Sequence, residues 1–87
     1  MIFISLVKFR EKAAKERIAE NLKLIEKEKK EGIKVLGIYY TLGRYDSVSI
    51  IEAPNEKVAM KSLMRRGWLA SETLVAVPAE EARKFVE

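Results

Sequence analysis

Five side chains between residues 39 and 46 have the chemistry to contact a small ligand. They are Tyr39, Thr41, Arg44, Tyr45 and Asp46. A carboxylate beside hydroxyl groups can bind a polar ligand, or accept a proton when burial raises its pKa. The planar guanidinium of Arg44 can bind an anionic group, and the ring of Tyr45 can stack on a ligand. This segment is therefore the first candidate for a binding site.

Each candidate also has a purely structural interpretation, which we favour for the individual side chains. Asp46 can accept hydrogen bonds from backbone N–H groups of its own turn. Arg44 is typical of an exposed turn residue, and an aromatic residue that begins a strand, such as Tyr45, usually packs in the core. Glu72 is a possible second carboxylate, but a charge on an edge strand also discourages aggregation. Trp68 could stack on a ligand, although packing of a helix–strand connection is favoured.

Hydrophobic periodicity predicts four strands and two long helices that would position these residues. An apolar run predicts a first strand over 2–9, and apolar residues spaced by three and four from Ala14 onwards predict a helix over 11–31. The remaining expected elements are strands at 35–42, 45–53 and 71–77, a helix at 56–66 and a short terminal helix at 79–86. The order β-α-β-β-α-β predicts a single ferredoxin-like α+β domain over residues 1–87, with both long helices on one face of a four-stranded antiparallel sheet.

Gly43 and Arg44 are expected to form a two-residue turn between the second and third strands. A glycine in the first position of such a turn fits type II′. In this register Thr41 faces Asp46 across the hairpin, and Tyr39, Thr41 and Asp46 project from the same face of the sheet. A three-residue loop would instead place Asp46 on the face opposite Tyr39.

The first strand is apolar on both faces, which predicts a homodimer or a larger homo-oligomer. The two sets are Ile2, Ile4 and Leu6 on one side and Phe3, Val7 and Phe9 on the other. Two helices can cover only one set, and we expect the second set to be left uncovered. Soluble monomers seldom expose an apolar patch on the order of several hundred Å², so a second copy of the sheet should cover it. The alternative is that the terminal helix folds back over this face, although it offers little apolar area.

The composition is that of a soluble globular domain without the common metal and thiol chemistries. Of the 87 residues, 48% are apolar and 34% are charged, and cysteine and histidine are absent. We therefore expect no metal site, no bound cofactor and no Ser-His or Cys-His catalysis. No segment approaches the roughly 20 apolar residues that span a membrane. The apolar N-terminus is too short for a signal peptide, so a cytoplasmic location is expected. Abundant Lys, Glu and Ile are typical of heat-adapted proteins.

The net charge of +4 raises the question of nucleic-acid binding. Lys57, Lys61 and Arg65 recur every four residues along the second expected helix and could follow a row of phosphates. The same positions lie opposite the apolar face of that helix, where solvated charges belong in any case. No aromatic residues interleave with these cations, so nucleic acid is not an expected partner.

The segment 41–46 resembles the GYD domain family, which is named for the pattern Gly-x-Tyr-Asp, here Gly43, Tyr45 and Asp46. Three further segments are similar to that family: 39–42, 52–54 and 71–74. The resemblance covers nearly the whole chain and implies a dimeric α+β barrel, in which two ferredoxin-like sheets pack face to face. It implies no particular chemistry, because the family has no established activity. Related barrels include cofactor-free monooxygenases, isomerases and effector-binding domains.

These observations favour a small homo-oligomeric domain that binds a small molecule in a cavity between paired sheets. We expect that cavity near Tyr39, Thr41 and Asp46, with Phe3 and Val7 in its wall. The alternative is a cofactor-free isomerase or monooxygenase-like enzyme that uses Asp46 as its general base, so whether the chain is an enzyme stays open. A purely structural oligomer without a ligand is a third possibility.

Overall fold

The computed structural model describes residues 1–12 and 14–87 and shows the expected order of elements. Four strands form one antiparallel sheet: β1 (Ile2–Phe9), β2 (Lys34–Tyr40), β3 (Ser47–Glu52) and β4 (Leu69–Ala76). The helices are α1 (Lys15–Lys29), α2 (Glu56–Met64) and α3 (Ala79–Ala82), the last continued by the 3₁₀ helix η1 (Arg83–Val86). The strand order is β2-β3-β1-β4, which is that of a ferredoxin-like fold. The predicted fold class is confirmed.

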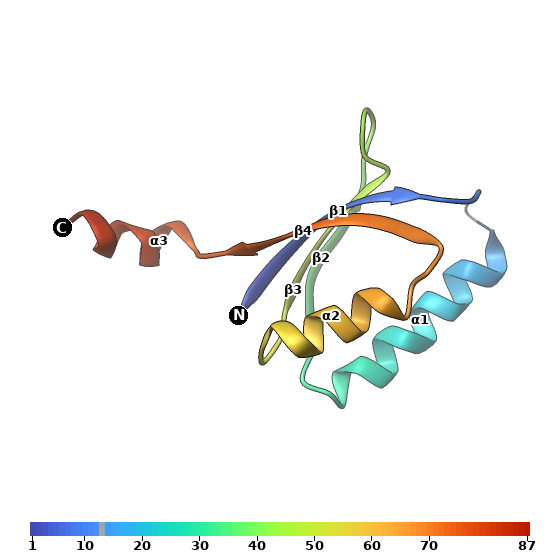
Figure 1. Cartoon of the computed structure of the whole chain (residues 1–87), viewed down its shortest axis with the longest axis horizontal. Helices are drawn as coiled ribbons and strands as arrows, with labels where there is room; N and C mark the ends of the chain where they lie inside the picture. Colours follow the sequence, from blue (N-terminus) through green and yellow to red (C-terminus); the bar gives the residue numbers. More distant parts are fainter. Residues whose placement is uncertain (13) are drawn as a thin grey trace.

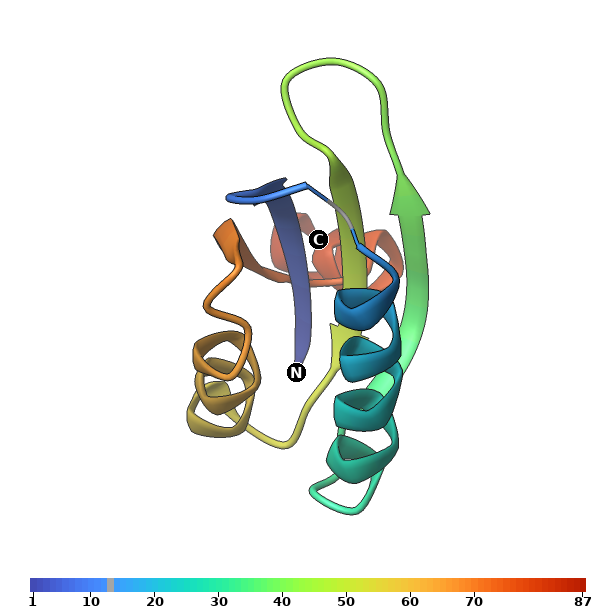
Figure 2. The same ribbon diagram turned by 90° about the vertical axis from the view of Figure 1, so that its right-hand side faces the viewer.

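Both long helices lie on one side of the sheet (Figure 1). In Figure 2, α1 and α2 stand in front of the strands, whereas the C-terminal segment lies behind them. This arrangement follows from right-handed crossovers between the strands that each helix connects. We call the side with α1 and α2 the helix face of the sheet and the other side the open face.

The strand register shows which residues share each face. Phe3 of β1 pairs with Ile51 of β3, and Val7 pairs with Ser47; directly opposite residues of an antiparallel pair point to the same side. Phe3 and Val7 are both buried, beneath the helices. The expectation that Phe3 and Val7 lie on the uncovered face is therefore wrong. Alternation along a strand separates two sets of side chains, but it does not say which set the helices cover.

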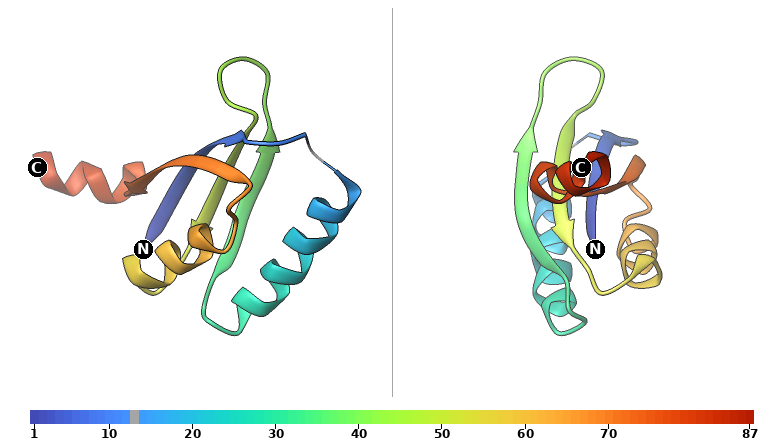
Figure 3. Two further views of the ribbon diagram at one scale, coloured as in Figure 1. Left: turned by 45° about the vertical axis from the view of Figure 1, so that its right-hand side comes forward. Right: turned by 90° about the vertical axis from the view of Figure 1, so that its left-hand side faces the viewer.

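The open face is apolar along the two central strands. Ile4 of β1 lies between Ile50 of β3 and Leu74 of β4, and Leu6 pairs with Val48. Leu74 is exposed, and the other four are only partly buried. Within the described part of the chain, no helix packs on this face (Figure 3). The sequence prediction of an uncovered apolar sheet surface thus holds, although for the opposite set of β1 residues.

The C-terminal segment extends away from the body of the molecule (Figure 1, Figure 3). Phe85 is 74% exposed and Val86 is 86% exposed. The alternative expectation, in which the terminal helix folds back over the open face, is therefore wrong for the single chain.

Helix α1 begins at Lys15, four residues later than expected. Ala14 is its N-cap residue and has extended backbone, with φ −122° and ψ 153°, so it does not belong to the helical apolar face. Glu11 lies outside the helix, and its carboxylate pairs with Arg17 Nε at 2.8 Å. The residues before the helix include no Ser, Thr, Asp or Asn, the side chains that normally mark such a start. Ala13, which the expected helix included, lies outside the described residues.

A buried ion pair joins α1 to the end of α2. Arg66 donates hydrogen bonds from Nη1 and Nη2 to the two carboxylate oxygens of Glu28, each at 2.9 Å. Arg66 Nε also donates to Asn21 Oδ1 at 2.8 Å, and Nη1 donates to the backbone oxygen of Ser62 at 2.7 Å. Burial alone would raise the pKa of the Glu28 carboxyl. The hydrogen bonds and positive charge of Arg66, together with hydrogen bonds from Ser62 and Arg65, outweigh burial and hold that pKa below its usual value.

We expect Glu28→Gln to lower the free energy of unfolding by about 3–5 kcal/mol, because it leaves the guanidinium of Arg66 buried without its counter-charge. Urea unfolding at neutral pH measures the loss. Since the folded-state pKa of Glu28 is lowered, the contribution of its carboxylate is complete above the usual pKa and disappears as pH falls through the lowered one. The difference between wild type and variant should therefore shrink in acid.

Glu26→Gln is the matched control, because the pair between Glu26 and Lys29 is exposed on the same helix. It should cost less than about 1 kcal/mol. Equal losses in the two glutamate variants would contradict the role given to the buried pair.

Candidate functional site

Hydrogen bonds close the hairpin between β2 and β3 in the predicted register. The backbone N–H of Thr41 donates to the backbone oxygen of Asp46 at 3.0 Å, and Thr41 Oγ1 donates to the backbone oxygen of Tyr45 at 2.7 Å. Gly43 has φ +102°, in a region that glycine adopts without strain. The strands themselves end at Tyr40 and Ser47, so the connection is longer than the expected two residues although its register is that of a two-residue turn.

Asp46 attaches this hairpin to β1. Its backbone N–H donates to the backbone oxygen of Val7 at 2.8 Å, and its Oδ2 accepts a hydrogen bond from the backbone N–H of Phe9 at 2.7 Å. The carboxylate thus continues the β1–β3 ladder beyond the point where β3 begins. The carboxylate of Asp46 accepts a hydrogen bond from a backbone amide, as the structural interpretation proposed. That amide, however, belongs to the neighbouring strand and not to the turn of Asp46.

Tyr45 and Glu72 meet across the end of β1. The phenol of Tyr45 donates to Glu72 Oε2 at 2.6 Å, and this hydrogen bond, together with desolvation, raises the pKa of the phenol. The guanidinium of Arg44 lies 5.7 Å from the centre of the Tyr45 ring, within the range of a cation–π contact. Tyr45 therefore does not pack in the core as expected, because its hydroxyl finds a partner on the edge strand β4.

Tyr39 does not join this group. Its ring lies over Gly37, where an added Cβ would stand 2.9 Å from the ring, so a side chain at position 37 would displace the ring. The structure therefore brings Thr41, Tyr45 and Asp46 together at the hairpin. Arg44 and Glu72 both contact Tyr45. Among the described residues, no hydrogen bond connects Tyr39 to Asp46.

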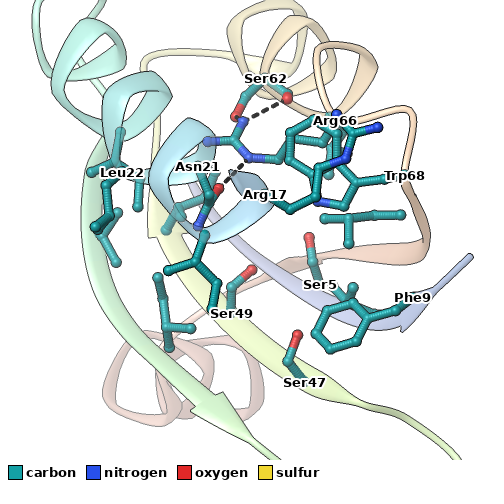
Figure 4. Close-up of a pocket in the computed structure, with 18 of the residues that line it drawn as sticks. Ser5, Phe9, Arg17, Asn21, Leu22, Ser47, Ser49, Ser62, Arg66 and Trp68 are labelled. Carbon is teal, nitrogen blue, oxygen red and sulfur yellow. Dashed lines mark hydrogen bonds between the residues drawn. The ribbon is translucent and has the colours of Figure 1, made fainter. Parts of the chain in front are cut away.

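A cavity of about 240 Å³ lies between the helix face of the sheet and the two helices (Figure 4). Ile18 and Leu22 of α1 line it, yet they are 50% and 59% exposed. Apolar side chains on the inner face of a helix are normally buried against the sheet. Their exposure means that α1 stands off from the strands, so the cavity occupies space that a closer helix would fill with core.

Serines from the two central strands line the floor of the cavity. The hydroxyls of Ser5, Ser47 and Ser49 point toward the helices in Figure 4. Ser5 Oγ shares a hydrogen bond of 2.9 Å with Thr73 Oγ1. For the hydroxyls of Ser47 and Ser49, the structure shows no hydrogen-bond partner among residues 1–12 and 14–87. Ser47 is only 7% exposed, but its hydroxyl is not a buried group without a partner. It is open to the cavity, where a bound molecule can form a hydrogen bond with it.

The two arginines in the cavity wall are already paired, whereas Lys12, which also lines the cavity, is exposed. Arg66 is held by Glu28 and Asn21, as described above. Arg17 donates to two glutamates at 2.8 and 2.9 Å, and its guanidinium lies 4.8 Å from the centre of the Trp68 ring. Trp68 thus packs in the helix–strand connection, as favoured from the sequence, and it also lines the cavity. The cavity therefore offers a ligand an apolar wall, serine hydroxyls and the exposed ammonium group of Lys12.

The sequence interpretation missed this cavity. The available signal was an alternation, since Ser47 and Ser49 interleave with Val48 and Ile50, and Ser5 interrupts the apolar run of β1. Serine in a strand carries little information by itself, because it also fits an ordinary solvated sheet face.

The basic stripe on α2 is partly used within the molecule. Arg65 forms two hydrogen bonds with the carboxylate of Glu31, at 2.6 and 2.7 Å, and its Nη1 lies 3.1 Å from Glu28 Oε2. Lys57 and Lys61 are exposed. This pairing of Arg65 favours the interpretation of the stripe as structural and solvated charge.

Comparison with known protein families shows which family the chain belongs to. The family model for the GYD domain matches residues 3–86, nearly the whole chain. The chain belongs to the GYD domain family. Its signature residues Gly43, Tyr45 and Asp46 are those that close the β2–β3 hairpin and tie it to β1 and β4. No curated protein matches this GYD domain significantly. None of the helices in the described ranges is long and apolar enough to cross a membrane.

Replacement of Asp46 tests whether the GYD aspartate is structural. Asp46→Ala should lower the free energy of unfolding by about 1–3 kcal/mol, because the N–H of Phe9 loses its acceptor. Asp46→Asn should cost clearly less, since the amide oxygen can still accept that hydrogen bond. Thermal or chemical unfolding of the two variants measures both effects. Unchanged stability in Asp46→Ala would show that the carboxylate does not hold β1.

Proposed function

We propose that this GYD domain is a small-molecule-binding module that works as a homodimer and holds its ligand in the cavity between the helix face and α1. The cavity supports the proposal by its combination of apolar walls with the hydroxyls of Ser47 and Ser49. Small-molecule sites are typically concave and mostly apolar, with a few directed polar groups. The cavity has this character.

The pairing of the two arginines in the cavity wall favours a neutral ligand in its interior, while Lys12 adds one exposed cation to the lining. Arg66 and Arg17 are both occupied by carboxylates, and an anion would have to displace those partners at the cost of burying unpaired charge. A molecule with a small apolar ring or chain and one hydroxyl or carbonyl group would satisfy the serines and fill the apolar space. We therefore propose that ligand class.

The proposed position differs from the one expected between paired sheets. That expectation needed Phe3 and Val7 in the interface, but both face the helices. Val7 instead lines the cavity beneath α1. A cofactor-free enzyme with Asp46 as general base gains no support either, because its Oδ2 accepts the hydrogen bond from Phe9.

The open face supports the homodimer. Ile4, Leu6, Val48 and Ile50 form an apolar surface on the side of the sheet opposite the helices, and Leu74 of β4 extends it. Exposed apolar surfaces of this kind mark interaction sites in soluble proteins. A second copy offers the matching apolar surface, so two sheets can pack face to face.

Ligand binding is tested with phenol and cyclohexanol, neutral molecules that carry one hydroxyl on an apolar ring. In ¹H–¹⁵N spectra of labelled protein, millimolar probe should shift the backbone amides of Ser47 and Ser49 and the indole N–H of Trp68. Ser49→Leu should weaken binding at least tenfold, because the larger side chain fills the cavity. Perturbation confined to Leu6 and Ile50 would instead place the ligand between paired sheets.

Ser71→Leu is the control, since it makes the same change on β4 at an exposed position that does not line the cavity. It should leave probe binding unchanged. Ser49→Ala separates the loss of the hydroxyl from the filling of space if the leucine variant is unstable. Absence of any perturbation by either probe would contradict the proposed binding function.

Sedimentation tests the homodimer. At micromolar concentration the wild type should sediment with twice the mass of one chain. Leu6→Lys should yield monomers, because it places a charge in the proposed interface. Met60→Lys, at an exposed position on α2, should leave the dimer intact. A wild type that sediments as a stable single chain would contradict the dimer.

A further inference from the structure

The C-terminal arm, residues 77–87, is the most isolated part of the molecule. It consists of the four residues of α3 and the four of η1, with short flanks. Its apolar side chains include Val77, 49% exposed, as well as the strongly exposed Phe85 and Val86. These side chains are therefore available to a neighbouring surface.

A helix of this length cannot hold its shape alone in water. Isolated helices shorter than roughly 12–15 residues are marginal even for favourable sequences, and the arm has eight helical residues. Helix α3 begins after Pro78, which is its N-cap residue and makes no side-chain hydrogen bond. The helical arm therefore needs a surface on which to pack.

The direction of the arm indicates where that surface lies. In Figure 1 the arm leaves β4 on the side away from α1 and α2, and in the right-hand view of Figure 3 it stands in front of the strands while the helices lie behind. It therefore projects from the open-face side of the sheet. A second copy that covers the open face would lie directly beside it.

Charge also favours a second copy as the occupant. The arm carries Glu80, Glu81 and Glu87 against Arg83 and Lys84, so it has one net negative charge. The whole chain has a net charge of +4, so the rest of the chain carries a net charge of +5. An acidic arm and a basic body attract each other across an interface between copies.

We propose that the C-terminal arm of each copy packs against the body of the second copy, so that two arms clasp the dimer from opposite sides. This interaction rests on the proposed homodimer through the open face and adds a second contact region to it. Phe85 and Val86 provide the apolar contacts, and burial of two such side chains stabilises the pair of chains. The arm becomes ordered only in the assembled dimer.

A nitroxide label on the arm tests the proposal directly. The chain has no cysteine, so Lys84→Cys provides a single attachment site in the full-length protein. The electron paramagnetic resonance spectrum should be broad, and the label immobile, at concentrations where sedimentation shows a dimer. It should become sharp on dilution below the dissociation constant.

Phe85→Asp in the labelled chain should mobilise the arm and raise the dimer dissociation constant at least tenfold. Met64→Asp is the matched control, since Met64 is similarly exposed but lies at the end of α2, and it should change neither quantity. Circular dichroism should show the same folded body in both variants, because the arm projects away from its own sheet.

The possible results separate this proposal from the homodimer itself. A dimer with a mobile label would overturn the clasp and leave the dimer standing. A monomer with an immobile label would mean that the arm packs on its own chain, and a monomer with a mobile label would overturn both proposals. Only a label that is immobilised together with dimer formation supports the clasp.

Discussion

The position of α1 depends on the guanidinium of Arg66. This group binds Glu28 and Asn21 of α1 while it is also bonded to Ser62 of α2, so it fixes the two helices to one another. Helix α1 stands off from the strands, with Ile18 and Leu22 half-exposed above them. A buried charged pair needs its full set of hydrogen bonds, and that requirement holds α1 where apolar packing alone would draw it onto the sheet.

The cavity is a consequence of this spacing. Its floor is the polar stripe of Ser5, Ser47 and Ser49 on a sheet whose other side is apolar, and Arg66 and Glu28 in its wall are bonded to each other. The proposed site would select its ligand mainly by shape and by hydrogen bonds to hydroxyl groups, because the arginines in its wall are held by carboxylates. The GYD signature residues lie at the β2–β3 hairpin. There, Asp46 and Tyr45 form hydrogen bonds that connect the hairpin to β1 and β4.

The sequence predicted the elements well because the period of its apolar residues changes clearly between strands and helices. It also predicted that Thr41 lies opposite Asp46. It could not predict which side of β1 the helices cover, because Phe3 and Ile4 are equally apolar. Nor could it predict the cavity, which depends on Arg66 reaching Glu28 from 38 residues away; no local pattern records such a contact.

Strands β1 and β3 contribute side chains to two opposite surfaces of the molecule. Along β3, Ser47 and Ser49 face the cavity, while the residues between and beside them, Val48 and Ile50, face the open side. The same backbone therefore lies beneath both the proposed ligand site and the proposed contact with a second copy. By thermodynamic linkage, a ligand that altered the twist of these strands would change the affinity between copies, and assembly would change ligand affinity by the same factor.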